Sequence, residues 1–316
     1  MATSSNELRF DSRAILVTGA GRGIGRQHAL YLASRGAKVV VNDNGCDVEG
    51  EGTSREPADS VVREITSAGG EAVANYDSIA NAQGGEYAIE AALDSFGRLD
   101  AVVHNAGILT QATVEELSDA QVRAMVDTHL VGAFNVTRPA IRVMRNAGYG
   151  RLVYASSNSG IIGISYMAHY GAAKMGLVGL VRCLASEVKD FNFRANAYGP
   201  NASTRMADGL DPRLLKVLDD NLGDFGAKVV PEVIPPLIAY LAHEECSVSG
   251  ETFSTVAGRV SRFFIGLTEG FYSDSLSAED VRDHIGEIMD TDGYTIPREL
   301  VEDLTQAMRR AQSVNA

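Results

Sequence analysis

The sequence predicts an α/β protein with a doubly wound parallel sheet of about seven strands and helices on both faces. Along residues 13–256, short apolar or β-branched runs alternate with helical segments. The runs lack the strict apolar–polar alternation of a sheet that faces water on one side, which favours parallel strands buried on both faces. No repeat or linker divides this stretch, so we interpret it as a single domain.

The first expected elements set the pattern for the rest. Residues 14–17 (Ala-Ile-Leu-Val) form an apolar run that ends at glycines, as expected for a buried strand. A helix is expected over residues 23–35, with Gly36 suited to its C-cap. Further strands are expected at residues 38–42, 72–74, 99–104, 152–154, 194–198 and 252–256, and further helices at residues 58–68, 82–96, 172–188 and 231–242.

Composition and charge exclude several classes of protein. Hydrophobic residues make up 45% of the 316 residues, too many for a disordered chain. A net charge of −13 argues against nucleic acids and anionic membrane surfaces as partners. No run of about 18 apolar residues predicts a membrane span, and the polar first residues lack a signal core, so we expect a cytoplasmic location. Three scattered cysteines, Cys46, Cys183 and Cys246, predict free thiols and no metal site.

The acid excess is concentrated near the C-terminus. Residues 259–316 hold six arginines, no lysine and eleven acidic residues, a net charge of −5. We therefore expect a dinucleotide-binding domain over residues 1–258 and an acidic extension over residues 259–316. The extension begins with aromatic residues, which predicts that it packs on the domain or on a partner subunit. These are Phe263, Phe264, Phe271 and Tyr272.

A glycine-rich turn, Thr18–Gly25, joins the first strand to the first helix. Glycines let the backbone turn tightly and approach a pyrophosphate, and the helix that begins near Gly23 directs its positive end at that phosphate. The spacing is G-x-x-x-G-x-G, since Ile24 stands where G-x-G-x-x-G needs glycine. The expected cofactor-binding residues of this turn are Gly19, Arg22, Gly23, Ile24 and Gly25.

Acidic residues at the ends of two strands bear on the choice of nucleotide. Asp43 ends the second strand, twenty-four residues after Gly19, where a carboxylate accepts both hydroxyls of the adenosine ribose and repels a 2′-phosphate. This favours NAD over NADP, whereas the base Arg22 favours NADP; we give Asp43 the greater weight. Asp77 closes the third strand and is a candidate for the adenine amino group or a plain turn residue.

Three residues form a candidate catalytic set. Tyr170 and Lys174 are four residues apart, a spacing that on a helix puts both side chains on one face. The ammonium group is expected to favour the phenolate and to bring the pKa of Tyr170 toward the range useful for proton transfer. Ser157 lies thirteen residues before Tyr170, after a strand, where its hydroxyl is placed to hold the substrate oxygen.

Taken together, the turn at residues 18–25, Asn105-Ala106-Gly107, Ser157 and Tyr170-x-x-x-Lys174 resemble the short-chain dehydrogenase/reductase family over residues 13–256. The resemblance implies a Rossmann-type fold and a homodimer or homotetramer. It implies that Tyr170 is the acid/base, that Ser157 positions the reacting oxygen and that Lys174 tunes Tyr170 and holds the nicotinamide ribose. It also implies that Asn105, Ala106 and Gly107 line the cofactor site.

A narrower resemblance concerns His129, which stands where the family usually has an Asn that supports a water relay to the lysine. The chain is similar to the dehydrogenase unit of peroxisomal multifunctional enzyme type 2 and its bacterial relatives, which carry His there. That branch oxidises 3-hydroxyacyl-CoA thioesters with NAD, and several members act on hydroxysteroids. His129 either alters the relay or replaces the amide as a hydrogen-bonding group. The segments that carry the resemblance are residues 42–47, 74–78, 129–132, 149–151 and 200–202, which add Pro200 to the expected cofactor site.

The expected substrate is a bulky apolar alcohol or ketone. The segment 203–230 is long for that branch and lies where the family builds its substrate lid. It contains an amphipathic stretch, residues 210–222, that is either an apolar lid or an ordinary connecting helix; its apolar residues are Leu210, Leu214, Leu215, Val217, Leu218 and Leu222. The net charge disfavours an acyl-CoA unless Lys and Arg gather at the pocket mouth.

The sequence therefore predicts NAD-dependent oxidation of a secondary alcohol, or the reverse reduction, on a hydroxysteroid or 3-hydroxyacyl-CoA type of substrate. A second possibility is a steroid or terpenoid ketone reductase that uses NADPH. A third, from another class, is a nicotinamide-binding protein without turnover, which the missing Asn would fit.

Overall fold

A computed structural model describes residues 7–189, 191–204, 206, 210–212, 215–216 and 223–314. The chain divides into two compact units, Met1–Arg262 and Phe263–Ala316. Among the described residues, no helix is long and apolar enough to cross a membrane, and no group of three His, Cys, Asp or Glu residues is placed to hold a metal ion.

The first unit is built on an eight-stranded sheet in the order β3-β2-β1-β4-β5-β6-β7-β8. The strands are β1 Ala14–Thr18, β2 Lys38–Asn42, β3 Glu71–Asn75, β4 Ala101–His104, β5 Gly150–Ala155, β6 Phe193–Asn201, β7 Thr252–Val256 and β8 Arg259–Phe263. The first seven pair in parallel, with Ala14 opposite Lys38 and Ile15 opposite Ala101. Because β1 and β4 are neighbours, the strand order reverses beside β1, where α/β folds bind ligands.

The eighth strand was not predicted. β8 hydrogen-bonds to β7 across a two-residue turn, Ala257-Gly258, in which both residues have positive φ (49° and 83°). Such a turn is typical of a β-hairpin, and two residues cannot join parallel strands, so β8 runs antiparallel to β7. The sequence analysis placed these residues in the C-terminal extension, and the hairpin moves the division of the chain from residue 258 to residue 262.

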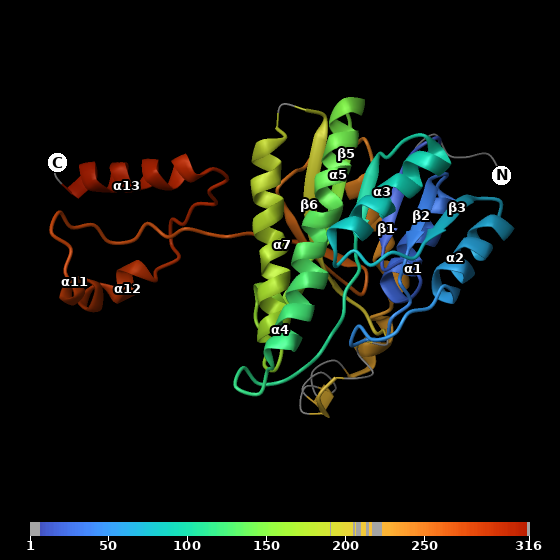
Figure 1. Cartoon of the computed structure of the whole chain (residues 1–316). Helices are drawn as coiled ribbons and strands as arrows, with labels where there is room; N and C mark the ends of the chain where they lie inside the picture. Colours follow the sequence, from blue (N-terminus) through green and yellow to red (C-terminus); the bar gives the residue numbers. More distant parts are fainter. Residues whose placement is uncertain are drawn as a thin grey trace. The chain divides into compact units, whose positions relative to one another are not determined.

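Helices cover both faces of the sheet, as predicted (Figure 1). On β1, Ile15 and Val17 pack in one apolar cluster and Leu16 in the other, so the strand is buried on both sides. On the Ile15 face lie α1 Gly23–Ser34, α2 Glu56–Ser67 and α10 Pro235–Ala242. On the Leu16 face lie α3 Ala82–Phe96, α5 Gly132–Ala147 and α7 Ala168–Glu187.

The region between β4 and β5 holds helices that the sequence analysis did not assign. The segment begins with α4 Asp119–Val126, passes through a π-helical turn η1 Asp127–Val131 and continues as α5. Pro139 lies inside α5, a position at which proline usually interrupts a helix, which weakens the sequence signal. The shorter elements of this unit are α6 Asn158–Ile161 and the 3₁₀ turns η2 Gly223–Lys228 and η3 Pro231–Val233.

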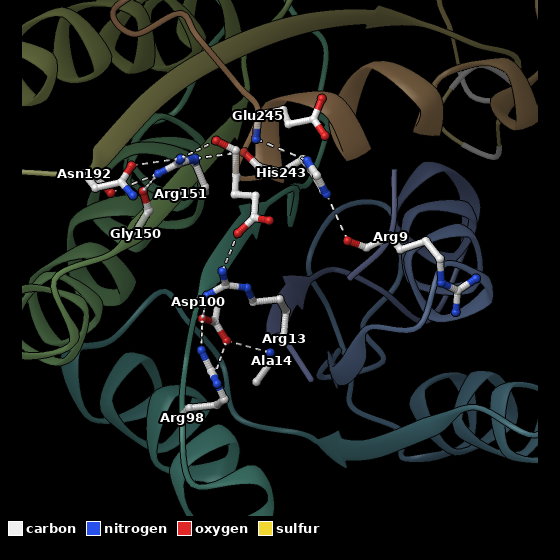
Figure 2. A network of polar contacts seen from close by, with 11 residues as sticks. Arg9, Arg13, Ala14, Arg98, Asp100, Gly150, Arg151, Asn192, His243 and Glu245 are labelled. Carbon is white, nitrogen blue, oxygen red and sulfur yellow. Dashed lines mark hydrogen bonds and ion pairs between the residues drawn. The ribbon is translucent and has the colours of Figure 1, made fainter. Parts of the chain in front are cut away.

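The amino edge of the sheet is held by a polar network (Figure 2). The buried Arg151 side chain donates five hydrogen bonds, to the carbonyls of His243, Gly150, Asn192 and Glu244 and to the Asn192 amide oxygen. Beside it, the Asp100 carboxylate accepts from Arg13, Arg98 and the Ala14 N–H. The network ties the starts of β1, β4 and β5 to the end of α10.

The second unit has its own ordered contacts. An antiparallel bridge pairs Leu267 with Thr295. Phe264 stacks on Tyr294 and Phe271 stacks on His284, with ring centroids 5.7 and 3.8 Å apart. Its helices are α11 Ala278–Asp283, α12 Ile285–Ile288 and α13 Leu300–Val314. The aromatic residues that the sequence analysis singled out thus include two that organise this unit internally.

Candidate active site

The glycine turn between β1 and α1 is shaped by close backbone contacts. Gly19 has a φ of 63°, and a Cβ there would lie 2.6 Å from the Ala106 Cα. A Cβ on Gly25 would collide with the Gly19 carbonyl. Both positions therefore require glycine. Ile24 packs partly on the apolar cluster of α1, so the missing glycine of the stricter motif is replaced by a side chain that anchors the helix.

The turn is tied to the end of β4 by Thr18 and Asn105. The Thr18 hydroxyl accepts hydrogen bonds from the N–H groups of Asn105 and Ala106, at 3.0 and 3.1 Å. The Asn105 amide group donates to the carbonyls of Thr18 and Gly19, at 3.2 Å each. Asn105 therefore holds the glycine turn in place as well as lining the cavity described below.

Two carboxylates hold the loops that follow β2 and β3. One oxygen of Asp43 accepts from the Gly21 N–H (2.8 Å) and the other from the Gly45 N–H (2.7 Å). Asp77 accepts from the Asn75 side chain at 2.7 Å. Asp43 thereby bridges the glycine turn and the loop after β2. In dinucleotide-binding folds, a carboxylate at this position accepts hydrogen bonds from the adenosine ribose.

A cavity of about 790 Å³ lies at the carboxyl edge of the sheet. All fifteen residues that the sequence analysis assigned to the site line it, which places the glycine turn and the catalytic set in one space. They are Gly19, Arg22, Gly23, Ile24, Gly25, Asp43, Asp77, Asn105, Ala106, Gly107, His129, Ser157, Tyr170, Lys174 and Pro200.

Tyr170 lies in the first turn of α7 and faces Ser157, the N-cap of α6. Burial raises the pKa of Tyr170, while its hydrogen bond with Ser157 acts in the opposite direction. The Ser157 hydroxyl also accepts from the Ser159 N–H at 3.1 Å, which fixes its position. The sequence analysis expected a lowered pKa for Tyr170; the structure corrects this, because desolvation of the phenolate dominates.

Lys174 is buried one helical turn beyond Tyr170. Its ammonium donates to the Ala155 carbonyl at 2.6 Å and lies 5.5 Å from the centroid of the Tyr170 ring. Burial lowers the pKa of Lys174 from 10.5 to about 7. The lysine is therefore poised between its charged and neutral forms near neutral pH, the range in which a proton-transfer group is most useful.

His129 lies in the π-helical turn and contacts Tyr170. Its imidazole meets the Tyr170 ring edge to face, with centroids 5.2 Å apart. Nε2 lies 2.9 Å from the Ile108 carbonyl and 3.2 Å from the Ile108 N–H, so it donates in one tautomer and accepts in the other. Burial holds the pKa of His129 well below 6.5, so the ring is neutral. Gly107 leaves room for it, since a Cβ there would overlap the imidazole.

Apolar side chains line the part of the cavity beyond Tyr170. Leu109 and Met167 form a buried cluster on which Met206 and Leu210 pack. Leu215 also lines the cavity. The sequence analysis named Leu210 and Leu215 but had no signal for Leu109 or Met167. The other predicted lid residues, Leu214, Val217, Leu218 and Leu222, lie outside the described residues.

Further cavity residues come from the loop after β2, of which only the first part, within residues 42–47, had been marked by the resemblance. Cys46, Glu49, Gly50 and Glu51 line the cavity. Their local sequence is polar and glycine-rich, which indicates a surface loop and does not predict a place in the cavity that Tyr170 lines.

Comparison with known proteins agrees with this architecture. A family model described as short chain dehydrogenase matches residues 13–213. The chain is 40% identical over 302 residues to mouse (Mus musculus) peroxisomal multifunctional enzyme type 2, covering 94% of this chain and 39% of that enzyme. It is 43% identical over 286 residues to a putative short-chain type dehydrogenase/reductase of Mycobacterium tuberculosis, covering 90% of this chain and 96% of the relative.

A solved structure extends the comparison. The structure of a 7α-hydroxysteroid dehydrogenase complexed with NADH and 7-oxo glycochenodeoxycholic acid matches with a TM-score of 0.72 and 25% identity, over 81% of this chain and 98% of that one. The chain spans about two fifths of the mouse multifunctional enzyme's length. These matches confirm the family resemblance inferred from the motifs, including its multifunctional-enzyme branch.

Proposed function

The chain belongs to the short-chain dehydrogenase/reductase family, and from that premise we propose that it oxidises a secondary alcohol, or reduces the ketone, with NAD(H). The proposed substrate is bulky and apolar, of the hydroxysteroid or 3-hydroxyacyl-CoA type. One observation carries the proposal: the Ser157–Tyr170 pair and the buried Lys174 line the same cavity as the glycine turn. A reacting carbon held there lies between a proton-transfer group and a dinucleotide site.

The residues present suit a dinucleotide. The first turn of α1 has no side-chain cap, so its N–H groups remain available for a pyrophosphate. Gly19 and Gly25 keep that space clear, because side chains there would clash with the backbone. Asp43 and Asp77 would hold the adenosine end, while Lys174 would hold the nicotinamide ribose. The nicotinamide supplies the acceptor or donor of hydride.

The position of Asp43, directly after β2, favours NAD over NADP. A carboxylate at the end of β2 repels the 2′-phosphate of NADP. Arg22 lines the same cavity and favours a 2′-phosphate, and one nitrogen of its guanidinium donates to the Cys46 carbonyl at 3.1 Å; we give Asp43 the greater weight. Comparing kcat/KM with NAD and with NADP tests this assignment. A preference for NADP would overturn it and would favour the second candidate, an NADPH-dependent steroid or terpenoid ketone reductase.

In the proposed mechanism, Ser157 donates a hydrogen bond to the substrate oxygen and Tyr170, as phenolate, takes the hydroxyl proton. The hydrogen on the same carbon leaves as hydride, so a ketone forms; the reduction runs in reverse. Burial raises the pKa of Tyr170, and a protonated Lys174, whose ammonium lies 5.5 Å from the ring centroid, would favour the phenolate against that burial. His129 orients the Tyr170 ring through its edge-to-face contact.

We also propose a homodimer or homotetramer in the cytoplasm. Phe134 on α5 and Met175 on α7 are exposed apolar side chains on the two longest helices of the domain. The C-terminal extension is proposed to pack on the domain or on a partner subunit, since α13 exposes Leu300, Leu304 and Met308. Light scattering of the full chain and of a chain ending at residue 262 tests the assembly.

A panel of alcohols tests the reaction itself. 3-Hydroxyacyl thioesters, hydroxysteroids and cyclic terpene alcohols are each supplied with NAD, and NADH absorbance is followed. Turnover that needs Tyr170 supports the proposal. Nicotinamide binding by calorimetry without turnover of any member contradicts it and supports a binding protein instead.

A further inference from the structure

The loop after β2, residues Asn44–Glu51, connects the cofactor turn to the reacting end of the cavity. It begins beside Asp43, which holds the Gly45 N–H, and the Cys46 carbonyl accepts from Arg22. Farther along, the Val48 carbonyl accepts from the Leu109 N–H at 2.8 Å. We call these eight residues the β2 loop. Cys46 and Val48 of this loop are therefore fixed to different parts of the cavity wall, the glycine turn and the segment after β4.

The β2 loop reaches the catalytic tyrosine. Cys46 and Tyr170 pack on the same small cluster, which includes Ile108. Val48 and Tyr170 likewise pack on the cluster of Leu109 and Met167. The loop thus forms part of the cavity wall beside Tyr170.

The shape of the β2 loop is set internally by Asp47. One carboxylate oxygen of Asp47 accepts from the N–H groups of Glu49 and Glu51, at 2.9 Å each. The Asp47 N–H donates to the Glu51 carbonyl, also at 2.9 Å. Gly50 has a φ of 98°, and a Cβ there would lie 3.2 Å from Ile108 Cγ2. This closed turn holds two exposed carboxylates, Glu49 and Glu51, at the cavity wall.

The charges around the cavity are mostly negative. Among the described lining residues there are five carboxylates and two cations. The cations, Arg22 and Lys174, lie at the glycine turn and beside Tyr170, where the cofactor is proposed to bind. The carboxylates are Asp43, Glu49, Glu51, Asp77 and Asp127. Asp43, Asp77 and both cations are proposed to hold the cofactor, so the described charged lining residues that remain are three acids, Glu49, Glu51 and Asp127.

We propose that the β2 loop is a specificity element that rejects phosphate-bearing acyl carriers, so that the substrate is an uncharged, bulky secondary alcohol. This rests on the proposed function, and it chooses between the two substrate types left open there. Like charges at a cavity mouth lower both encounter rate and affinity, whereas an uncharged alcohol pays no such penalty and gains from the apolar cluster beyond Tyr170.

Two thioesters with the same 3-hydroxyacyl chain test the proposal, one on CoA and one on uncharged N-acetylcysteamine. For the parent, we expect kcat/KM for the CoA ester to be about tenfold lower. In Glu49→Lys/Glu51→Lys, kcat/KM for the CoA ester divided by kcat/KM for the N-acetylcysteamine ester should rise about tenfold at low salt. The rise should shrink in 0.5 M salt, where the screening length is roughly 4 Å. If only a hydroxysteroid turns over, the two thioesters are tested as inhibitors of that reaction, and their inhibition constants are compared.

The matched control is Glu90→Lys/Glu187→Lys, which changes the net charge equally at exposed positions of α3 and α7. It should leave the ratio within about twofold, because salt screens charges farther away than a Debye length. Glu49→Gln/Glu51→Gln should give a smaller rise than the double lysine variant. A parent that prefers the CoA ester, or a ratio that neither loop variant changes, overturns this inference. No turnover of any alcohol overturns the proposed function instead.

Discussion

Each of the two edges of the sheet buries one cation, but the two cations differ in how many hydrogen bonds they donate. At the amino edge, Arg151 donates five hydrogen bonds (Figure 2). At the carboxyl edge, the Lys174 ammonium donates to the Ala155 carbonyl alone among the described residues. Nearby, the Nδ1 atoms of His104 and His129 are buried without a partner there. A buried polar network that is fully paired stabilises a fold, whereas incompletely paired groups keep capacity for a ligand or a proton.

The largest expected effect lies at the carboxyl edge. Tyr170→Phe removes the hydroxyl that we propose transfers the proton, so we expect kcat to fall about 10³-fold. The free energy of unfolding should change by less than about 1 kcal/mol, because the ring remains in place. Steady-state kinetics and urea unfolding measure the two quantities. Tyr87→Phe, at an exposed position of α3, is the control and should change neither. A Tyr170→Phe rate close to the parent's would remove the tyrosine from the chemistry.

At the amino edge, removing the side-chain polar group of Arg151 should lower the free energy of unfolding and leave kcat nearly unchanged. Arg151→Met removes five buried hydrogen bonds, so we expect the free energy of unfolding to fall by about 3 kcal/mol. Backbone N–H groups of Gly150 and Cys246 still reach the carbonyls of Asn192 and His243. The kcat of the folded fraction should stay within about twofold. Arg142→Met is the control, since its side chain is 71% exposed and its ion pair lies on the surface. An equal loss in both variants would contradict the distinction between the edges.

Burial of Lys174 should make the free energy of unfolding depend on pH. Its pKa is about 7 in the folded protein and about 10.5 in the unfolded chain. Between these values the unfolded chain binds more protons, so stability rises with pH, by up to about 1.4 kcal/mol per unit. Below pH 7 both states are protonated, and the full penalty of burying the charge is present.

Lys174→Met should therefore lose this rise and gain stability over the parent most clearly near pH 6. Chemical denaturation from pH 6 to 10 measures it. Arg151→Met should keep the rise, because an arginine does not titrate in this range. Parallel curves for the parent and Lys174→Met would show that the lysine keeps an ordinary pKa.

The smallest effect is expected at His129. An Asn at this position can also bond to the Ile108 backbone, so His129→Asn should keep kcat within about threefold. His129→Leu, which cannot bond there, should lower kcat further and provides the matched comparison. A large gain in rate on introducing Asn would mean that the parent relay is defective, which neither the contact with Tyr170 nor the neutral ring predicts.

Much of the site could be predicted because its motifs are local. The turn at residues 18–25 and the spacing of Tyr170 and Lys174 depend on neighbours in the chain, and all fifteen predicted residues line one cavity. The predicted lowering of the pKa of Tyr170 was wrong, because the shift depends on burial by segments that are far away in the sequence. The π-helical turn at His129 had no local signal.

The sequence by itself determined the parallel sheet, the glycine turn and the catalytic spacing, because hydrophobic periodicity and helix geometry act within a few residues. Only the tertiary structure decided where the β2 loop lies, how Arg151 is satisfied and that β8 completes the sheet. The first two join residues far apart in the chain, since Cys46 and Tyr170 share a cluster and Arg151 bonds to His243, whereas β8 extends the sheet through a hairpin with β7. Such contacts are set by which elements become neighbours when the core closes.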